Sequence, residues 1–136
     1  MNKFLINAEY YLIESKNVEN DLVTRKECCE LAYENFLLIN DKDYRTKKIT
    51  EIKQVLKEIS NESFNKGVDI FNELNEEESF QPDKLNDKSL DKLNLAIKYL
   101  ENAKQCGNKD CAEILKECKK LFVKLKKQKY NNRIMI

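Results

Sequence analysis

Residues that commonly carry catalytic chemistry are few in this chain, and their spacing does not form a recognisable active site. The 136 residues include no histidine and only two glycines, Gly67 and Gly107. Without histidine, acid–base catalysis near neutral pH would need a carboxylate, or a lysine or cysteine with a shifted pKa. Two isolated glycines cannot form the glycine-rich loop that holds phosphates in nucleotide-binding motifs. We therefore predict a non-enzymatic protein without a cofactor.

The five cysteines are the second group of potentially reactive residues: Cys28 and Cys29 are adjacent, and Cys106, Cys111 and Cys118 lie near the other end. The absence of a Cys-x-x-Cys pair and of histidine excludes the commonest zinc sites and leaves only an irregular all-sulfur cluster. An odd number of cysteines fits a reducing compartment better than a disulfide framework. We expect no metal, and buried thiols with Cys111 and Cys118 on one helical stripe.

Charge is distributed unevenly, although the formal net charge is only +1. Residues 69–91 contain eight acids and two lysines, a local charge of −6, whereas residues 119–133 contain seven bases and no acid. The run Glu76–Glu78 lacks the alternating oxygen ligands of a calcium loop, so we expect a solvated acidic surface there. The two segments could attract each other, or the basic segment could attract another molecule.

No targeting or membrane-spanning segment is evident in the sequence. The opening has only Phe4–Ile6 as a continuous apolar run, far below the roughly 7 to 15 residues of a signal-peptide core. No stretch approaches the about 18 to 20 apolar residues that span a bilayer. We expect a soluble, intracellular and cytoplasmic protein.

Apolar residues recur along the chain with a helical period. The chain is also long enough for one domain with its own hydrophobic core. We predict an all-α fold, a single domain over residues 1–130 with five to six antiparallel helices stacked as helical hairpins, either repeat-like or as a bundle. An acidic loop is expected over residues 75–88, a break or bend near Asn61, and a non-helical tail over 131–136. The expected helices cover 2–15, 21–39, one or two segments starting at a Thr46 cap, 89–105 and 110–130.

The clearest hairpin lies between Leu95 and Leu115. Small and apolar residues recur at helical spacing up to Ala103, and Gly107-Asn108 then ends the helix, with Gly107 in the left-handed conformation. Asp110 followed by Glu113 has the spacing of a capping box, which predicts the start of the next helix.

This hairpin resembles the tetratricopeptide class of helical repeats, specifically its Sel-like branch. The resemblance rests on the following positions: Ala96, Tyr99, Ala103, Gly107, Asn108, Asp110, Cys111 and Leu115. It implies a right-handed stack of antiparallel helix pairs whose concave side receives a peptide or another protein. An unrelated helical bundle is the alternative. The three expected helices up to Ile59 are also similar to the microtubule-interacting-and-trafficking domain, another peptide binder.

Function follows from these surfaces rather than from a reactive group. We predict a protein–protein interaction module, or a small scaffold or adaptor subunit of a larger assembly, with an acidic protein or peptide as partner. The candidate partner-binding residues are Lys120, Lys124, Lys127 and Phe80. The alternative is a lysine-rich docking element for anionic membranes or nucleic acid, which we favour less because only three arginines occur in the chain.

Overall fold

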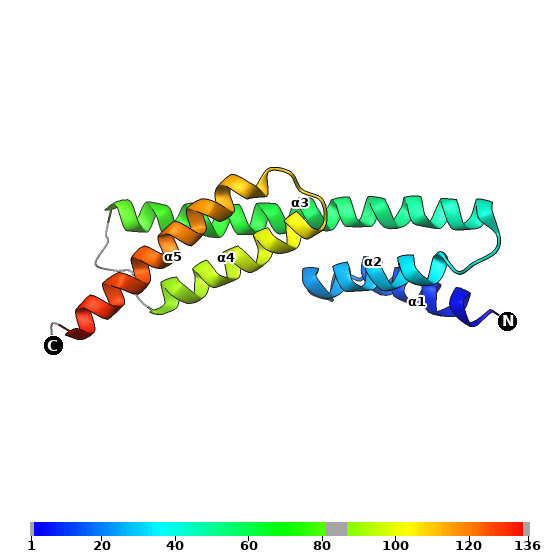
Figure 1. The fold of residues 1–136 in the computed structure, drawn as a ribbon, viewed down its shortest axis with the longest axis horizontal. Coiled ribbons are helices and arrows are strands. Elements are labelled where there is room, and N and C mark those ends of the chain that lie inside the picture. Colours follow the sequence, from blue (N-terminus) through cyan, green and yellow to red (C-terminus); the bar gives the residue numbers. More distant parts are fainter. Residues whose placement is uncertain (1, 81–86, 135–136) are drawn as a thin grey trace. The chain divides into compact units, whose positions relative to one another are not determined.

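The described residues form five α-helices and no strand. The computed structural model describes the backbone of residues 2–80 and 87–134 and the side chains of residues 2–76 and 88–127. The helices, shown in Figure 1, are α1 (Lys3–Lys16), α2 (Leu22–Phe36), α3 (Lys42–Phe80), α4 (Asp87–Gln105) and α5 (Cys111–Ile134). The all-α fold of helical hairpins expected from the sequence is confirmed.

The chain divides into two compact units, Met1–Asn61 and Glu62–Ile136. α3 crosses this division as one continuous helix, so the predicted break near Asn61 is wrong. The helix continues because its inward positions stay buried on both sides of the division, at Ile59 and Ser63. The single domain expected over residues 1–130 stays a prediction.

In the first unit, α1 and α2 pack together as a hairpin (Figure 1). The side chain of Asn2 caps α1 by accepting from the Phe4 N–H at 2.9 Å. Asp21 caps α2 in the same way, accepting from the Thr24 N–H at 2.7 Å. These caps satisfy backbone donors that a helix start would otherwise leave without a partner.

The start of α3 joins this hairpin through polar contacts. Asp41 accepts from the Tyr44 N–H at 3.1 Å, so the helix begins about one turn before the expected Thr46 cap. The Tyr44 hydroxyl donates to Glu9 of α1, and Lys16 of α1 pairs with Glu51 of α3. The same end of α3 therefore makes polar contacts with two positions of α1.

The core of the second unit is built from α3, α4 and α5. Its buried members are Leu74, Leu93, Leu100, Ala103, Cys111, Leu115, Cys118, Leu121 and Leu125. On α5 these residues recur every three or four positions, which places them on one side of the helix. α3 and α4 lie close together at Gly67, where the absence of a side chain leaves room for Leu100.

The turn between α4 and α5 confirms the predicted helix end. Gly107 has a φ of 103° and is the only residue with positive φ in the described part of the chain. Its N–H donates to the Lys104 carbonyl at 3.0 Å, and the Asn108 N–H donates to the Ala103 carbonyl at 3.0 Å. These two bonds are the Schellman pattern, which satisfies the last carbonyl groups of a helix. Asn108 Oδ1 then accepts from the Asp110 N–H at 2.8 Å, just before α5 starts.

Two expected irregular segments are helical at least in part. α3 runs to Phe80 and α4 begins at Asp87, so the predicted loop over 75–88 is wrong except at 81–86, which lie outside the described residues. Glutamates favour helix, and the chain's single proline, Pro82, lies beyond the last described residue of α3. The prediction of a non-helical tail is also wrong over residues 131–134, which belong to α5. No glycine or proline follows Gly107 to end this helix earlier.

Candidate functional site on the basic face of α5

The outward side of α5 is lined by lysines. Lys116, Lys120, Lys124 and Lys127 are all exposed, and they follow one another every three or four residues. At 3.6 residues per turn this spacing places them on one side of the helix, opposite the buried stripe that includes Leu115. We call these four lysines the basic face.

One apolar side chain lies among these ammonium groups. Val123 precedes Lys124 on the helix and has 51% of its surface exposed. Next to it, Phe122 is partly buried against the core, and the Lys126 ammonium lies 4.8 Å from the centre of its ring. The basic face thus combines positive charge with a small apolar contact surface.

The ion pairs that Lys119 and Lys120 form on this side of α5 are exposed to solvent. Lys120 Nζ lies 3.6 Å from a Glu117 carboxylate oxygen, and Lys119 Nζ lies 3.8 Å from one of Glu101. In both pairs the two side chains are about half exposed or more. Exposed pairs of this kind contribute little, roughly 0 to 1 kcal/mol, and therefore exchange easily for a partner's carboxylate.

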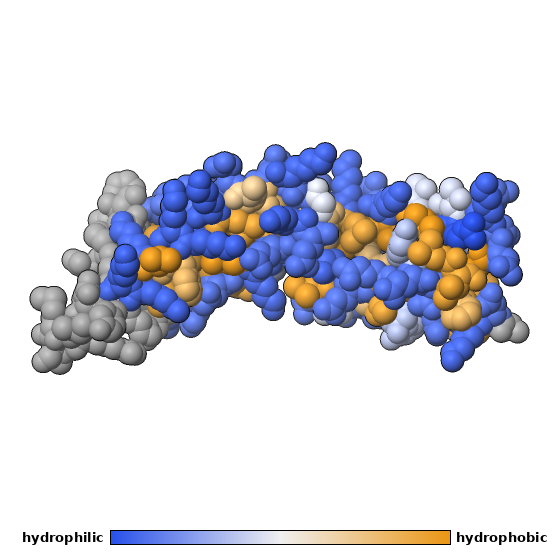
Figure 2. Space-filling model, viewed as in Figure 1, coloured by the Kyte–Doolittle hydropathy of each residue, from blue (hydrophilic) through white to orange (hydrophobic). Residues whose placement is uncertain are grey.

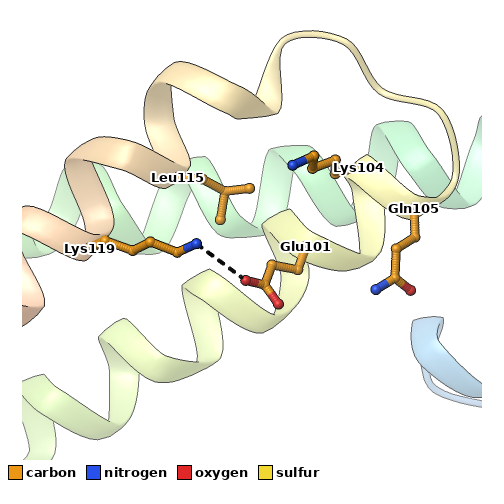
Figure 3. A pocket seen from close by; sticks show the side chains of 5 residues that line it. All are labelled: Glu101, Lys104, Gln105, Leu115 and Lys119. Carbon is orange, nitrogen blue, oxygen red and sulfur yellow. Dashed lines mark ion pairs between the residues drawn. The ribbon is translucent and has the colours of Figure 1, made fainter.

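A surface pocket of about 330 Å³ lies between α4 and α5, beside the basic face (Figure 3). Its lining residues are Glu101, Lys104, Gln105, Leu115 and Lys119. In Figure 3 the Lys119 ammonium points toward the Glu101 carboxylate, with which it forms the ion pair described above. Its walls combine the apolar Leu115 with four polar or charged side chains.

The structure places the predicted partner-binding residues in two different helices. The three predicted lysines, Lys120, Lys124 and Lys127, share the basic face of α5. Phe80 is the last residue of α3, not a loop residue, and its side chain lies outside the described residues. The candidate site therefore consists of lysines of α5 alone.

The cysteines belong to the packing rather than to a cluster of ligands. None of the five forms a disulfide bond, and all except the half-buried Cys106 are buried. Burial raises the pKa of the Cys29 thiol, and it raises that of Cys118 to about 11. A protonated thiol is a poor nucleophile. Among the described residues, no three metal-binding side chains gather at one point. The expected burial of Cys111 and Cys118 on one stripe of α5 is confirmed.

A second surface, in the first unit, was not predicted from the sequence. Ile6, Tyr10 and Ile13 of α1 are each more than half exposed, at positions i, i+4 and i+7. We call them the α1 stripe. Phe4, near the start of the same helix, is 43% exposed. Figure 2 shows apolar side chains reaching the surface over the α1–α2 hairpin. The helical spacing of these apolar residues was a signal that could have identified the stripe.

Comparison of the chain with protein-family models, with curated proteins and with solved structures gives no match. None of the helices in the described residues combines the length and the apolar character that crossing a bilayer requires. The site must therefore be interpreted from its own residues.

Proposed function

We propose that this chain is a non-enzymatic protein-interaction module whose basic face binds an acidic segment of a protein partner. The observation that carries the proposal is the placement of four exposed lysines on the side of α5 opposite its buried stripe. Lysines at this spacing attract carboxylates that follow one another along a helix or an extended segment. Val123, in their midst, adds an apolar contact that favours a protein side chain.

An anionic membrane or a nucleic acid fits this surface less well. The basic face contains no arginine, the residue that recognises phosphates and base edges through two parallel hydrogen bonds. Val123 is the one exposed large apolar residue among the described side chains of α5, so insertion into a lipid surface would bury little apolar area.

Two further predictions belong to this proposal. The α4–α5 hairpin supports a tetratricopeptide-like unit, because Ala96 and Ala103 are fully buried and Gly107 makes the tight turn. An intracellular, cytoplasmic location is supported by five cysteines that form no disulfide bond, a state that a reducing compartment would preserve.

Three probes separate the proposed partner class from its alternatives. They are a helical peptide rich in glutamate and leucine, vesicles containing phosphatidylserine, and a DNA duplex. We expect the full chain to bind the peptide with higher affinity than the other two. Because the leucines add apolar contacts, this binding should weaken only in part between about 50 and about 200 mM salt. Tighter binding to vesicles or duplex, lost completely over the same salt range, would replace this proposal with the electrostatic docking function.

A matched pair of variants tests the site itself. The basic-face variant carries Lys120→Glu, Lys124→Glu and Lys127→Glu. The control variant carries Lys47→Glu, Lys53→Glu and Lys57→Glu, at three exposed lysines of α3. Both changes alter the net charge equally. We expect the basic-face variant to lose about tenfold or more in affinity for the acidic peptide, while the control retains wild-type affinity within about twofold. Equal losses would show that only the overall charge matters.

A second candidate function is favoured by the compactness of the first unit, Met1–Asn61. It contains three helical segments, as the similarity to the trafficking-type peptide-binding domain requires, and it exposes the α1 stripe. In this alternative an amphipathic helix binds the stripe. Changing Ile6, Tyr10 and Ile13 to serine should then abolish binding of a leucine-rich helical peptide, while the basic-face variant retains it.

A further inference from the structure

The second unit also has an acidic face, on the outward side of α3. Asp69, Glu73 and Glu76 are exposed at positions i, i+4 and i+7. We call these three residues the acidic face. Within this set, the Glu73 carboxylate lies 3.2 Å from Lys92 Nζ, in a pair whose side chains are both about half exposed. The face therefore remains available to an incoming cation.

The acidic face repeats the spacing of the predicted lysines. Lys120, Lys124 and Lys127 are also at positions i, i+4 and i+7. Two helices side by side could therefore bring each lysine close to one carboxylate. Opposite charges at matched spacing steer association and set the register between two surfaces.

Within one chain, the acidic face of α3 points away from α5, and the basic face of α5 points away from α3. On α3 the acidic face lies opposite Leu74, and on α5 the basic face lies opposite Cys118. Leu74 and Cys118 belong to the same buried core, which lies between the two helices. Both charged faces are thus turned outward from this core, and one chain cannot pair them.

We propose that the acidic face of a second copy of this chain binds the basic face. This inference rests on the proposed function, because it names the partner that supplies the acidic segment. The contact is heterologous: each copy uses a different surface, so one copy can bind two others. Since it consists mainly of exposed ion pairs, the association is weak, and its Kd rises by about tenfold or more between about 50 and about 200 mM salt.

Charge-swap variants test the contact by sedimentation equilibrium over a range of protein concentrations. Alongside the basic-face variant, an acidic-face variant carries Asp69→Lys, Glu73→Lys and Glu76→Lys. Each variant alone has two faces of like charge and should remain at the monomer mass of 16.1 kDa. An equimolar mixture of the two should associate. A chain that carries all six changes should recover the self-association of the wild type at low salt.

The control variant of α3 lysines should self-associate like the wild type, and far-UV circular dichroism should show unchanged helicity throughout. A wild-type chain that stays monomeric at low salt, or a six-fold variant that fails to recover association, would overturn the inference. Binding of the glutamate-rich peptide is measured separately on the same proteins. If the peptide binds and the chain does not self-associate, the proposed function stands and only this inference fails.

Discussion

Gly67 of α3 and Leu100 of α4 lie so close that a Cβ atom on Gly67 would be 2.5 Å from Leu100 Cγ and 2.8 Å from its Cδ2. The same atom would be 3.1 Å from the Ala96 carbonyl oxygen. Leu100 is completely buried and cannot turn into solvent. A glycine at this position therefore permits the close packing of α3 on α4, although glycine in mid-helix lowers helix stability.

The first prediction concerns Gly67→Ala. The added methyl group must displace Leu100 or the α4 backbone, which typically costs about 1 to 3 kcal/mol, and the better helix propensity of alanine returns about 1 kcal/mol of that. We expect net destabilisation in urea unfolding. The double variant with Leu100→Ala should lose less stability than the sum of the single changes, since the smaller side chain makes room for the methyl group. Simple additivity would contradict the contact.

Gly107→Ala tests a different cost. No atom lies within 4 Å of a Cβ built on Gly107, so packing does not oppose the substitution. The φ of 103° at Gly107 does oppose the substitution, because this conformation costs an L-residue about 1 to 2 kcal/mol of stability. Thermal unfolding should show a loss of this size that no second substitution nearby relieves. An unchanged melting temperature would contradict the positive φ.

The α4–α5 hairpin could be predicted in detail because each of its features is local. A helix that ends at glycine and a stripe with a period of three to four are decided by neighbouring residues. The continuity of α3 could not be predicted in the same way. Ser60 and Asn61 favour a break locally, but burial of Ile59 and Ser63 against other elements outweighs that preference. The helical ends of the segment expected as an acidic loop have a related cause, since glutamates favour helix even where they are closely spaced.

The pH dependence of stability should report the contact between α1 and α3. A hydrogen bond from Lys16 is the main cause that lowers the pKa of Glu51 from its ordinary value of 4.5. A carboxyl with a lowered pKa in the folded state stabilises the fold above its ordinary pKa and loses this contribution as the pH falls through the folded value. The Glu51→Gln variant should therefore be less stable than wild type at pH 7, and the difference should shrink below about pH 4.5. Urea unfolding at pH 7 and below about pH 4.5 measures this difference in stability. A difference that does not depend on pH would contradict the pairing.

Thiol reactivity should follow burial. Cys106 is the only half-buried cysteine of the five, whereas Cys118 is fully buried with a pKa of about 11. We expect one thiol to react rapidly with an aromatic disulfide in the native protein, and the others to react only as the chain unfolds. Cys106→Ser should remove the rapid phase. Rapid modification of Cys118 in native protein would contradict the packing of α5.

The lysines of the candidate site were accessible to prediction because α5 alternates them with apolar residues at helical spacing. The α1 stripe was not predicted, because apolar residues at helical spacing usually mark the buried side of a helix, whereas α1 also has them on an exposed side. Phe80 shows the limit of composition: an aromatic residue in an acidic segment suggested a contact loop, yet the backbone there is helical.

The most direct measurement is a titration of isotope-labelled protein with the glutamate-rich peptide, followed by backbone amide chemical shifts. We predict that the largest changes occur along the outward side of α5, at Lys116, Lys120, Val123, Lys124 and Lys127, with small changes at the control lysines of α3. Changes centred on the α1 stripe, or spread evenly over all exposed lysines, would contradict this prediction.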